Sequence, residues 1–232
     1  MGDITLYTCS TPNGIKVSIA LEELSLAYRV VPIDISSGAQ KEPSFLAINP
    51  NGRIPAITDF GLRVFESGAI LQYLAETYDR DRTISYAPGT PEYWEQMSWL
   101  MFQMGGVGPM QGQANHFRLF AGEYSAYGIQ RYTAETKRLY SVLNDRLTVS
   151  PYLAGPKYTI ADIANFGWVR YAPLALEINL NEFPALKRWH SVILERSAVQ
   201  RGLAVPTPKS DAEIAERYRG LREKVDGLRS RA

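Results

Sequence analysis

ITLYTCSTPNGIKVSIALEELSL, residues 4–26, is the segment that decides the fold. Residues 4–8 are mostly β-branched or aromatic, which favours a strand, and Pro-Asn-Gly at 12–14 then indicates a turn. Beyond the turn, apolar residues recur at the spacing of one helix face, namely Val17, Ala20, Leu21 and Leu24. The charged residues Lys16, Glu22 and Glu23 are expected mostly on the opposite face. The segment therefore predicts a strand, a tight turn and an amphipathic helix.

The predicted turn lies at the N-terminus of a helix. The first turn of a helix has N–H groups without an intrahelical partner, and the helix dipole gives this end a partial positive charge. Such an end binds anions and lowers the pKa of a nearby thiol. Residues 11–14 are therefore a candidate site for a thiolate, and the single cysteine of the chain, Cys9, lies close by in the sequence.

The composition narrows the class of protein. The chain has 232 residues and a formal net charge of +1, which fits one large domain or two small ones. A nearly neutral chain lacks the basic stripe of a nucleic-acid-binding protein, and no apolar run is long enough to span a bilayer. We therefore expect neither nucleic acid nor membrane as a partner.

Cysteine and histidine are scarce. One cysteine cannot form an intramolecular disulfide, so a reducing, cytoplasmic location is expected. Two histidines and one cysteine make a His/Cys metal site unexpected.

Further strand and helix signals complete a small α/β unit. Residues 28–34 (YRVVPID) predict a second strand, residues 54–57 a third, and residues 62–65 a fourth that pairs back across a turn. Residues 66–68 (ESG) are expected to open a helix with the apolar face Leu71, Leu74, Ala75 and Tyr78. This order predicts an α/β domain over residues 1–80.

Strand signals are sparse after residue 80. Residues 81–91 have the Gly, Pro and charged residues of a linker, residues 92–210 predict an all-helical domain, and residues 211–232 predict a charged C-terminal tail with little apolar face. Within the helical domain, the Gly-rich stretch 105–109 is expected to interrupt or kink a helix. Thr159 and Asp162 have the spacing of a capping box, with Asp in place of the usual Glu.

Two short motifs of the first domain have features of a binding site. Ile54-Pro55 is a candidate for a cis peptide bond, although trans is far commoner; a cis bond would turn the polar backbone groups of Ile54 toward an extended peptide. Ser67 can simply cap the helix that follows it, or it can hold a carboxylate while Glu66 holds an ammonium. With the anion site, these motifs describe a pocket for a small thiol peptide with a free amino-acid end.

Five motifs carry a resemblance to a known family. NPNGRIPA at 49–56, FESGAI at 65–70 and TIAD at 159–162 resemble the cytosolic glutathione transferases, and the resemblance extends over nearly the full chain. TPNG at 11–14 and GGVGPMQGQ at 105–113 resemble, more narrowly, the nu class of bacteria and the fungal group similar to the yeast nitrogen regulator. The resemblance implies the glutathione transferase fold, with an α/β thioredoxin-like N-terminal domain and an all-α C-terminal domain, and a homodimer.

The resemblance also implies roles for individual residues. The Asn of TPNG, here Asn13, is expected near the glutathione sulfur with Thr11 beside it, and these two are the expected catalytic residues. The backbone of Ile54 is expected to pair with the cysteinyl unit, and Glu66 and Ser67 to hold the γ-glutamyl end. The other expected glutathione-binding residues are Gln40 and Arg53, near the glycyl end, and Arg131.

Two residues depart from the patterns of related classes. Tyr7 invites comparison with the catalytic Tyr of other transferase classes, but it lies early in the strand and is expected to be structural. Cys9 stands two residues before the position at which cysteine-dependent relatives carry their Cys, which is occupied here by Thr11. We therefore expect Cys9 to be a bystander, and a Cys9-dependent thiol oxidoreductase is an alternative.

The function expected from these residues is activation of the glutathione thiolate, with glutathione as co-substrate. The thiolate would attack a small-molecule disulfide, peroxide or electrophile; the resemblance favours disulfide or peroxide chemistry, and glutathione can supply both sulfurs for disulfide exchange. The second substrate is expected between the domains, near Asn115, His116, Phe117 and Tyr124. The alternative from another class is a binding or regulatory module with the same fold and no turnover.

Overall fold

The predicted strand, turn and helix of residues 4–26 are present in the computed structural model, which describes residues 3–229. Strand β1 (Ile4–Thr8) passes through a short turn into helix α1 (Gly14–Glu23). The sheet of this domain is mixed and has the strand order β2-β1-β3-β4. Strand β2 (Tyr28–Pro32) pairs parallel with β1, while β3 (Ala56–Asp59) pairs antiparallel with both β1 and β4 (Leu62–Phe65).

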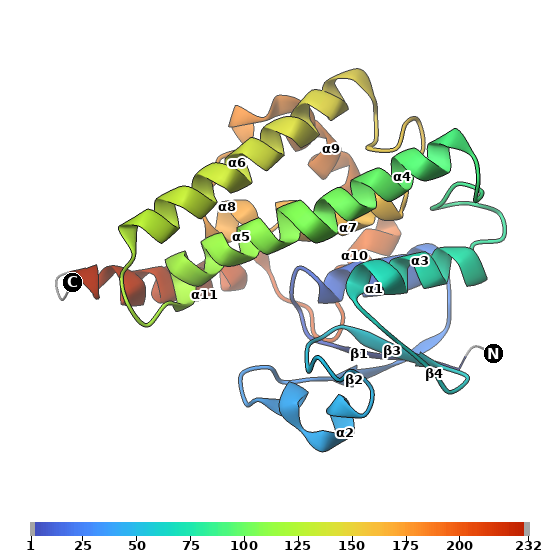
Figure 1. Cartoon of the computed structure of the whole chain (residues 1–232), viewed down its shortest axis with the longest axis horizontal. Coiled ribbons are helices and arrows are strands. Elements are labelled where there is room, and N and C mark those ends of the chain that lie inside the picture. The colour runs from blue at the N-terminus through green and yellow to red at the C-terminus, as the bar shows by residue number, and fades with distance from the viewer. Residues whose placement is uncertain (1–2, 230–232) are drawn as a thin grey trace.

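Helices cover the sheet and connect its strands. Helix α1 packs beside α3 (Ser67–Thr77), and both lie between the sheet and the helical domain (Figure 1). The 3₁₀ turn η1 (Ala39–Lys41) and the short helix α2 (Pro43–Leu46) connect β2 to β3 on the far side of the sheet (Figure 1). This arrangement places the end of β1 and the start of α1 at the edge facing the second domain, where a site between the domains can form.

One long helical rod spans the second domain. It consists of α4 (Pro91–Phe102), the π-helical segment η2 (Gln103–Val107), α5 (Gly108–Asn115) and a second π-helical segment, η3 (His116–Phe120). The Gly-rich stretch was expected to interrupt or kink the helix, and the α-helix is indeed interrupted there by the π-helical segment η2. The chain stays helical there because it widens into a π-turn, and Pro109 lies in the first turn of α5, where a missing N–H is tolerated.

The remaining helices pack around a buried central helix. They are α6 (Ala126–Val149), α7 (Ile160–Val169), α8 (Ala172–Ala175), the 3₁₀ turn η4 (Leu180–Glu182), α9 (Pro184–Leu194), α10 (Ser197–Leu203) and α11 (Asp211–Asp226). Every residue of α7 is buried. The predicted capping box is present, and the Asp162 carboxylate accepts hydrogen bonds from the backbone N–H groups of Thr159 and Leu153 and from the Trp189 indole. Since burial removes water from this carboxylate, the pKa of Asp162 is raised to about 6.

Helix α1 is more deeply buried than its amphipathic pattern predicts. Residues 14–21 are all buried, and Lys16, which was expected on the polar face, has no exposed surface. The physical reason is that other helices cover the rest of α1: α10 packs along it, where the Ser18 hydroxyl donates to the Gly202 carbonyl at 2.7 Å, and the Lys16 side chain is covered by η2 and α7. Glu23 is also covered, and its carboxylate pairs with the Arg196 guanidinium at 2.6 Å.

The end of the chain is an ordered helix over most of its length. Helix α11 begins with a capping box formed by Ser210 and Glu213. The prediction of little apolar face is wrong, because one side of this helix packs against the core through Ile214, Tyr218, Leu221 and Val225. Residues 230–232 of the predicted tail lie outside the described residues. None of the helices within residues 3–229 has the length and apolarity to cross a bilayer.

Candidate active site

The turn between β1 and α1 is closed by the side chain of Thr11. Its hydroxyl accepts from the Gly14 N–H at 3.1 Å and donates to the Cys9 carbonyl at 3.4 Å. A side chain at Gly14 would place its Cβ 2.1 Å from the Cys9 carbonyl oxygen, so the tight turn requires glycine. Thr11 therefore satisfies one free N–H of the first helical turn, and its hydroxyl proton is engaged by the Cys9 carbonyl within the same turn.

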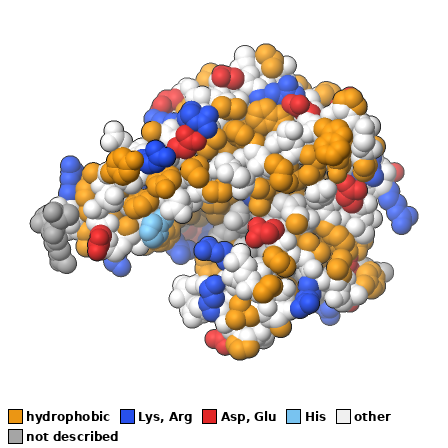
Figure 2. Space-filling view, in the orientation of Figure 1, with side chains coloured by type: hydrophobic (Ala, Val, Ile, Leu, Met, Phe, Trp, Pro, Cys, Tyr) orange, Lys and Arg blue, Asp and Glu red, His pale blue; other side chains and the backbone are white. Residues whose placement is uncertain are grey.

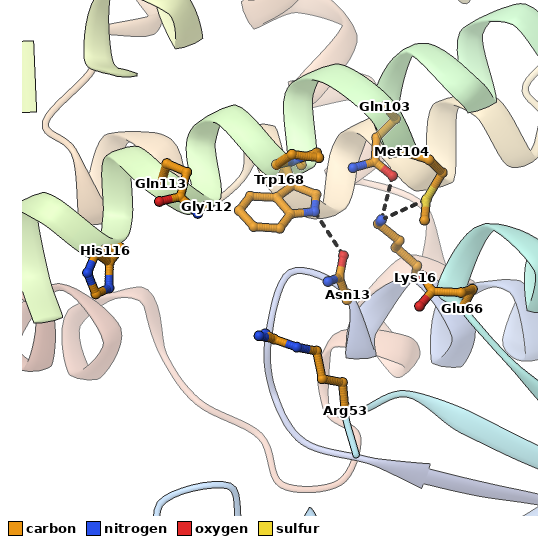
Figure 3. Close-up of a pocket in the computed structure, with 12 residues that line it drawn as sticks. Asn13, Lys16, Arg53, Glu66, Gln103, Met104, Gly112, Gln113, His116 and Trp168 are labelled. Carbon is orange, nitrogen blue, oxygen red and sulfur yellow. Dashed lines mark hydrogen bonds between the residues drawn. The ribbon is translucent and has the colours of Figure 1, made fainter. Parts of the chain in front are cut away.

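The side chain of Asn13 is held by the helical domain. The indole N–H of Trp168, on α7, donates to Asn13 Oδ1 at 2.9 Å, and Figure 3 shows the amide between the Trp168 ring and Arg53. An indole N–H can only donate, so Asn13 must turn its oxygen toward Trp168. Its NH₂ group is consequently left to donate elsewhere.

Helix α7 can approach the turn this closely because it carries a glycine at the contact. A Cβ at Gly167 would lie 2.4 Å from the Pro12 carbonyl oxygen. The contact between α7 and residues 12–13 therefore depends on the absence of a side chain, and it fixes the turn of the first domain against the second.

Two adjoining cavities meet at Asn13. The larger, of about 580 Å³, lies between the domains and is lined by Asn13, Lys16, Arg53, Glu66, Gln103, Met104, Gly108, Pro109, Gly112, Gln113, His116 and Trp168. The smaller, of about 60 Å³, is lined by Asn13, Asn49, Arg53, Ile54, Pro55, Glu66 and Ser67. Asn13, Arg53 and Glu66 line both cavities. Figure 2 shows a hollow between the smaller lobe and the helical part, with charged side chains of both signs at its margin.

The smaller cavity has an acidic residue and a hydroxyl side by side. Ser67 is the first residue of α3 and is buried, while Glu66 before it has a φ of 69°, in the left-handed region that non-glycine residues seldom adopt. Such conformations concentrate at functional sites, where the surrounding structure holds them in place. Ser67 and the first N–H groups of α3 can hold an anion, and Glu66 can hold a cation.

The loop before β3 forms the other wall. The Ile54–Pro55 peptide bond is cis, as the sequence led us to consider. The buried Asn49 side chain shapes the loop, since its amide donates to the Arg53 carbonyl at 2.6 Å and its oxygen accepts from the Asn51 N–H at 3.0 Å. The Arg53 side chain extends toward Asn13 (Figure 3).

A buried lysine lies under both motifs. Lys16 Nζ donates to Gln103 Oε1 at 2.5 Å and to Ser67 Oγ at 3.2 Å, and it lies 3.8 Å from Met104 Sδ. Burial lowers the pKa of Lys16 to about 7, against the opposing effect of the negative charge of Glu66. Sequence reasoning missed this residue because the helical period assigned it to the solvent side.

The structure brings together five of the eight predicted site residues. Asn13, Arg53, Ile54, Glu66 and Ser67 line the two cavities. The other three predicted residues, Thr11, Gln40 and Arg131, line neither of them.

These three residues lie in different surroundings. The Thr11 hydroxyl makes both of its hydrogen bonds within the turn between β1 and α1. Gln40 has its backbone next to Gly52, and its Nε2 is 3.5 Å from the Ile35 carbonyl oxygen. Arg131, on α6, lines a separate cavity with Tyr127 and Gln130, and its contact with glutathione stays a prediction.

Of the residues expected around the second substrate, His116 lines the larger cavity. Phe117 instead stacks on Tyr132 with ring centroids 5.5 Å apart, and the Arg229 guanidinium lies over the Tyr124 ring at 5.6 Å. Asn115 does not line the cavity. The cavity-lining residues that the sequence did not single out are Gln103, Met104, Gln113 and Trp168. The GGVGPMQGQ motif at 105–113 contains Gln113 and begins directly after Gln103 and Met104, so it could have located this part of the rod, whereas Trp168 lies outside it.

The described residues hold no metal-binding cluster. Within residues 3–229, no group of three or more His, Cys, Asp or Glu is arranged to hold a metal ion. Cys9 is partly buried and is not among the residues that line the two cavities.

Comparison with known proteins identifies the family. The disulfide-bond oxidoreductase YfcG of Escherichia coli (strain K12) is 45% identical over 207 residues, which cover 86% of this chain and 94% of that protein. The chain belongs to the glutathione S-transferase family. Residues 2–76 match the family model of the glutathione S-transferase N-terminal domain, and residues 114–197 match that of the C-terminal domain. The predicted fold, a thioredoxin-like domain followed by an all-helical domain, is confirmed.

Solved structures of this family resemble the chain closely. A glutathione transferase homologue from Lodderomyces elongisporus, solved with two glutathione molecules per subunit, has a TM-score of 0.85 and 46% identity, covering 89% of this chain and 100% of that one. The glutathione transferase URE2P6 from Phanerochaete chrysosporium, in complex with oxidized glutathione, has a TM-score of 0.85 and 41% identity, covering 92% and 98%. Both relatives bind glutathione in one of its redox forms.

Proposed function

We propose that this chain is a glutathione-dependent enzyme that activates the glutathione thiolate, with reduction of small-molecule disulfides as its main reaction. The observation that carries the proposal is the Asn13 amide, which lies where the two cavities meet and is turned by Trp168 so that its NH₂ group is left to donate. The N-terminus of α1 adds a partial positive charge at the same place. A thiolate bound there would be stabilised by both.

The two cavities suit the two parts of the reaction. In this proposal one glutathione binds with its γ-glutamyl end in the smaller cavity, at Glu66 and Ser67, and with its cysteinyl unit against Ile54. Arg53, which lines both cavities, faces the glycyl end or its surroundings. The larger cavity then receives the second substrate near His116, or a second glutathione. Relatives solved with two glutathione molecules, or with oxidized glutathione, support a site of this size.

The exchange needs no cysteine of the protein. The bound thiolate attacks one sulfur of the substrate disulfide, a mixed disulfide forms, and the other substrate sulfur leaves as a thiolate that takes up a proton. A second glutathione thiolate then attacks the glutathionyl sulfur of the mixed disulfide, which yields glutathione disulfide and releases the second substrate thiol. Asn13 and the α1 N–H groups stabilise the attacking thiolate of the first step.

The same thiolate can serve two further reactions, which we include in the proposal. It can attack a peroxide oxygen, which breaks the O–O bond and gives glutathione sulfenic acid and an alcohol or water; a second glutathione then converts the sulfenic acid into glutathione disulfide and water. It can also attack an electrophilic carbon, which gives a conjugate by addition of a proton or by loss of the leaving group. Nothing in the cavity lining is specific to either reaction, so disulfide reduction is placed first on the basis of the relatives named as disulfide-bond oxidoreductases.

We further propose a homodimer in the cytoplasm. Apolar side chains are strongly exposed on both domains, with 75% of Phe60 and 63% of Trp94 accessible to solvent. Figure 2 shows hydrophobic side chains gathered over the long helices and over part of the smaller lobe. A second copy covering these patches would remove them from water. The single cysteine, which is not disulfide-bonded, is compatible with a reducing compartment.

The test compares two variants in a panel of disulfide, hydroperoxide and electrophile substrates. Asn13→Ala should raise the pKa of the bound glutathione thiol and lower turnover about 10-fold or more, since it removes a donor to the thiolate. Cys9→Ser should leave both quantities close to those of the wild type. If Cys9→Ser abolishes turnover and Asn13→Ala does not, the protein is a cysteine-dependent oxidoreductase. Glutathione binding without turnover of any substrate would indicate the regulatory alternative.

A further inference from the structure

The cation of Lys16 is buried without a carboxylate partner. Its side chain has no solvent-exposed surface, and its hydrogen-bond acceptors, Gln103 Oε1 and Ser67 Oγ, are both neutral. Within residues 3–229, no carboxylate oxygen lies within 4.0 Å of this ammonium. Buried charges in proteins are normally paired, because leaving water costs an isolated ion several kcal/mol. An anion supplied from outside the chain would complete this environment.

The contact between Lys16 and Ser67 determines what Ser67 can offer a ligand. An ammonium only donates, so the Ser67 oxygen must accept the hydrogen bond from Nζ. The proton of the Ser67 hydroxyl is then free to point away from Lys16. Among the described residues, the only side-chain acceptor recorded for this proton is the weak acceptor Met104 Sδ, at 3.8 Å. Since Ser67 lines the smaller cavity, its proton is available to an acceptor bound there.

We propose that Lys16 is the positioning residue and counter-charge for the α-carboxylate of the γ-glutamyl end, which it binds through the Ser67 hydroxyl. This inference rests on the proposed function, because it takes glutathione as the occupant of the smaller cavity. It assigns the recognition of the amino-acid end to two charges: Glu66 for the ammonium and Lys16, behind Ser67, for the carboxylate.

The charged groups around Lys16 fit this assignment. Glu66, at the junction of β4 and α3, acts on Lys16 electrostatically in the free protein. A ligand ammonium bound at Glu66 would neutralise that charge and leave Lys16 as the cation for the carboxylate. The neighbouring segment η2 presents the neutral side chains of Gln103 and Met104, and α7 packs a glycine against the aliphatic part of Lys16. Arg53 is the other cation that lines the larger cavity.

Binding of a carboxylate should therefore take up a proton. Because burial sets the pKa of Lys16 in the free protein to about 7, most copies of this lysine are neutral at about pH 8. A carboxylate close by favours the charged form and raises the pKa again. Proton uptake on binding should approach one proton per site at about pH 8 and fall toward zero at about pH 5, where Lys16 is already charged.

The experiment is isothermal titration calorimetry of the full chain at about pH 8 in buffers of different ionisation enthalpy, which reports the protons taken up. The probes are S-methylglutathione, whose sulfur cannot titrate, and its analogue with 4-aminobutyrate in place of glutamate, which lacks only the α-carboxylate. The proteins are the wild type, Lys16→Met, which keeps the length and removes the charge, and Lys187→Met as a matched control at an exposed lysine of α9.

We expect Lys16→Met to weaken S-methylglutathione binding about 10- to 100-fold, because the hydrogen bond from Ser67 to the carboxylate loses the cation behind it. The same variant should show no proton uptake on binding. The analogue without the carboxylate should bind the wild type and Lys16→Met equally and without proton uptake. Lys187→Met should behave as the wild type.

Two results would overturn the inference. Unchanged affinity of Lys16→Met for S-methylglutathione would do so, and so would an equal loss for both probes, which would mean that Lys16 only supports the structure. If Lys16→Met does not fold, proton uptake by the wild type decides: equal uptake with both probes is incompatible with the inference. A wild type that binds neither probe would refute the proposed function as well, whereas binding of both without proton linkage would refute the inference alone.

Discussion

Replacing Asn13 by Asp separates the two halves of its proposed role. The Asp side chain has nearly the same shape and can still accept the hydrogen bond from the Trp168 indole, which is 2.9 Å long in the native structure. The change concerns the side-chain group that does not contact Trp168: the NH₂ donor becomes a carboxylate oxygen that cannot donate. The contact between the domains should persist, while the anion site for the thiolate gains a negative charge.

The expected effect on the thiol is large. A carboxylate and a thiolate about 4 Å apart repel by about 1 kcal/mol in water and by about 4 kcal/mol at an effective dielectric constant of about 20. This corresponds to a rise of about 1 to 3 units in the pKa of the bound thiol. The cavity is open to solvent, so the lower half of this range is expected (Figure 2). Turnover at neutral pH should fall about 10-fold for each unit, because only the thiolate reacts.

The free energy of unfolding should respond differently. Asn13→Asp should change it by less than about 1 kcal/mol, since the Trp168 N–H keeps an acceptor. Asn13→Ala leaves that indole N–H without a partner at a side chain that is only 9% exposed, which should cost about 1 to 3 kcal/mol. Trp168→Phe removes the donor instead and frees the amide to rotate, so turnover should fall by less than in Asn13→Ala.

The assay combines the ultraviolet absorbance of the bound thiolate as a function of pH with disulfide-reductase rates and denaturant unfolding of the three variants. An unchanged thiol pKa and turnover in Asn13→Asp would refute the reasoning, because a carboxylate facing the thiolate cannot be neutral in effect. Destabilisation of Asn13→Asp equal to that of Asn13→Ala would contradict the orientation assigned to the amide.

Three further predictions concern stability and assembly. Because the pKa of Lys16 is lowered to about 7 in the folded protein, the unfolded chain binds more protons than the folded chain between about pH 7 and 10. The free energy of unfolding should therefore rise with pH over this range, by about 5 kcal/mol at most. Denaturant titrations of Lys16→Met should no longer show this rise. Thr11→Val should lower the free energy of unfolding by about 1 kcal/mol, because the Gly14 N–H at the start of α1 loses its acceptor. The pKa of the bound thiol should stay nearly unchanged. A raised thiol pKa would show instead that the Thr11 hydroxyl donates to the glutathione sulfur. Sedimentation equilibrium should give twice the chain mass of 26.0 kDa for the wild type. Phe60→Glu should shift the mass toward the monomer, because it places a charge on an exposed apolar side chain that the dimer is proposed to cover. A monomeric wild type at micromolar concentration would exclude the dimer.

Local patterns were sufficient to predict the first domain. The strand, turn and helix of residues 4–26 follow from β-branched residues, a Pro-Asn-Gly turn and helical spacing, and all three are present. The Thr159–Asp162 capping box was also predictable, since both partners lie within one turn of the chain. The depth of burial of α1 was not, because it depends on α10, η2 and α7, which lie far along the sequence.

The candidate site divides in the same way. Asn13, Ile54, Glu66 and Ser67 belong to short motifs in which chemistry and position can be read together, and they line the cavities. Gln103 and Trp168 carry no such motif chemistry of their own, because a Gln or a Trp in a helix looks like any other packed residue. Their roles follow only from which side chain they meet across the domain boundary.

The site is thus a joint product of both domains in a specific chemical sense. Asn13 and Ser67 each belong to the first domain, and each could present either a donor or an acceptor to a ligand. Trp168, from α7 of the helical domain, donates to the Asn13 oxygen, which leaves only the NH₂ group of Asn13 for a ligand. Lys16 donates to the Ser67 oxygen, which leaves the Ser67 hydroxyl proton for a ligand, and Lys16 is itself held by Gln103 from the helical rod. In both cases a donor, the Trp168 indole or the charged form of Lys16, forces its neighbour to direct its own N–H or O–H elsewhere. The helical domain therefore does more than cover the cleft: Trp168 directs the Asn13 amide itself, and Gln103 holds the Lys16 that directs Ser67, so that both side chains offer the donors that an anionic ligand requires.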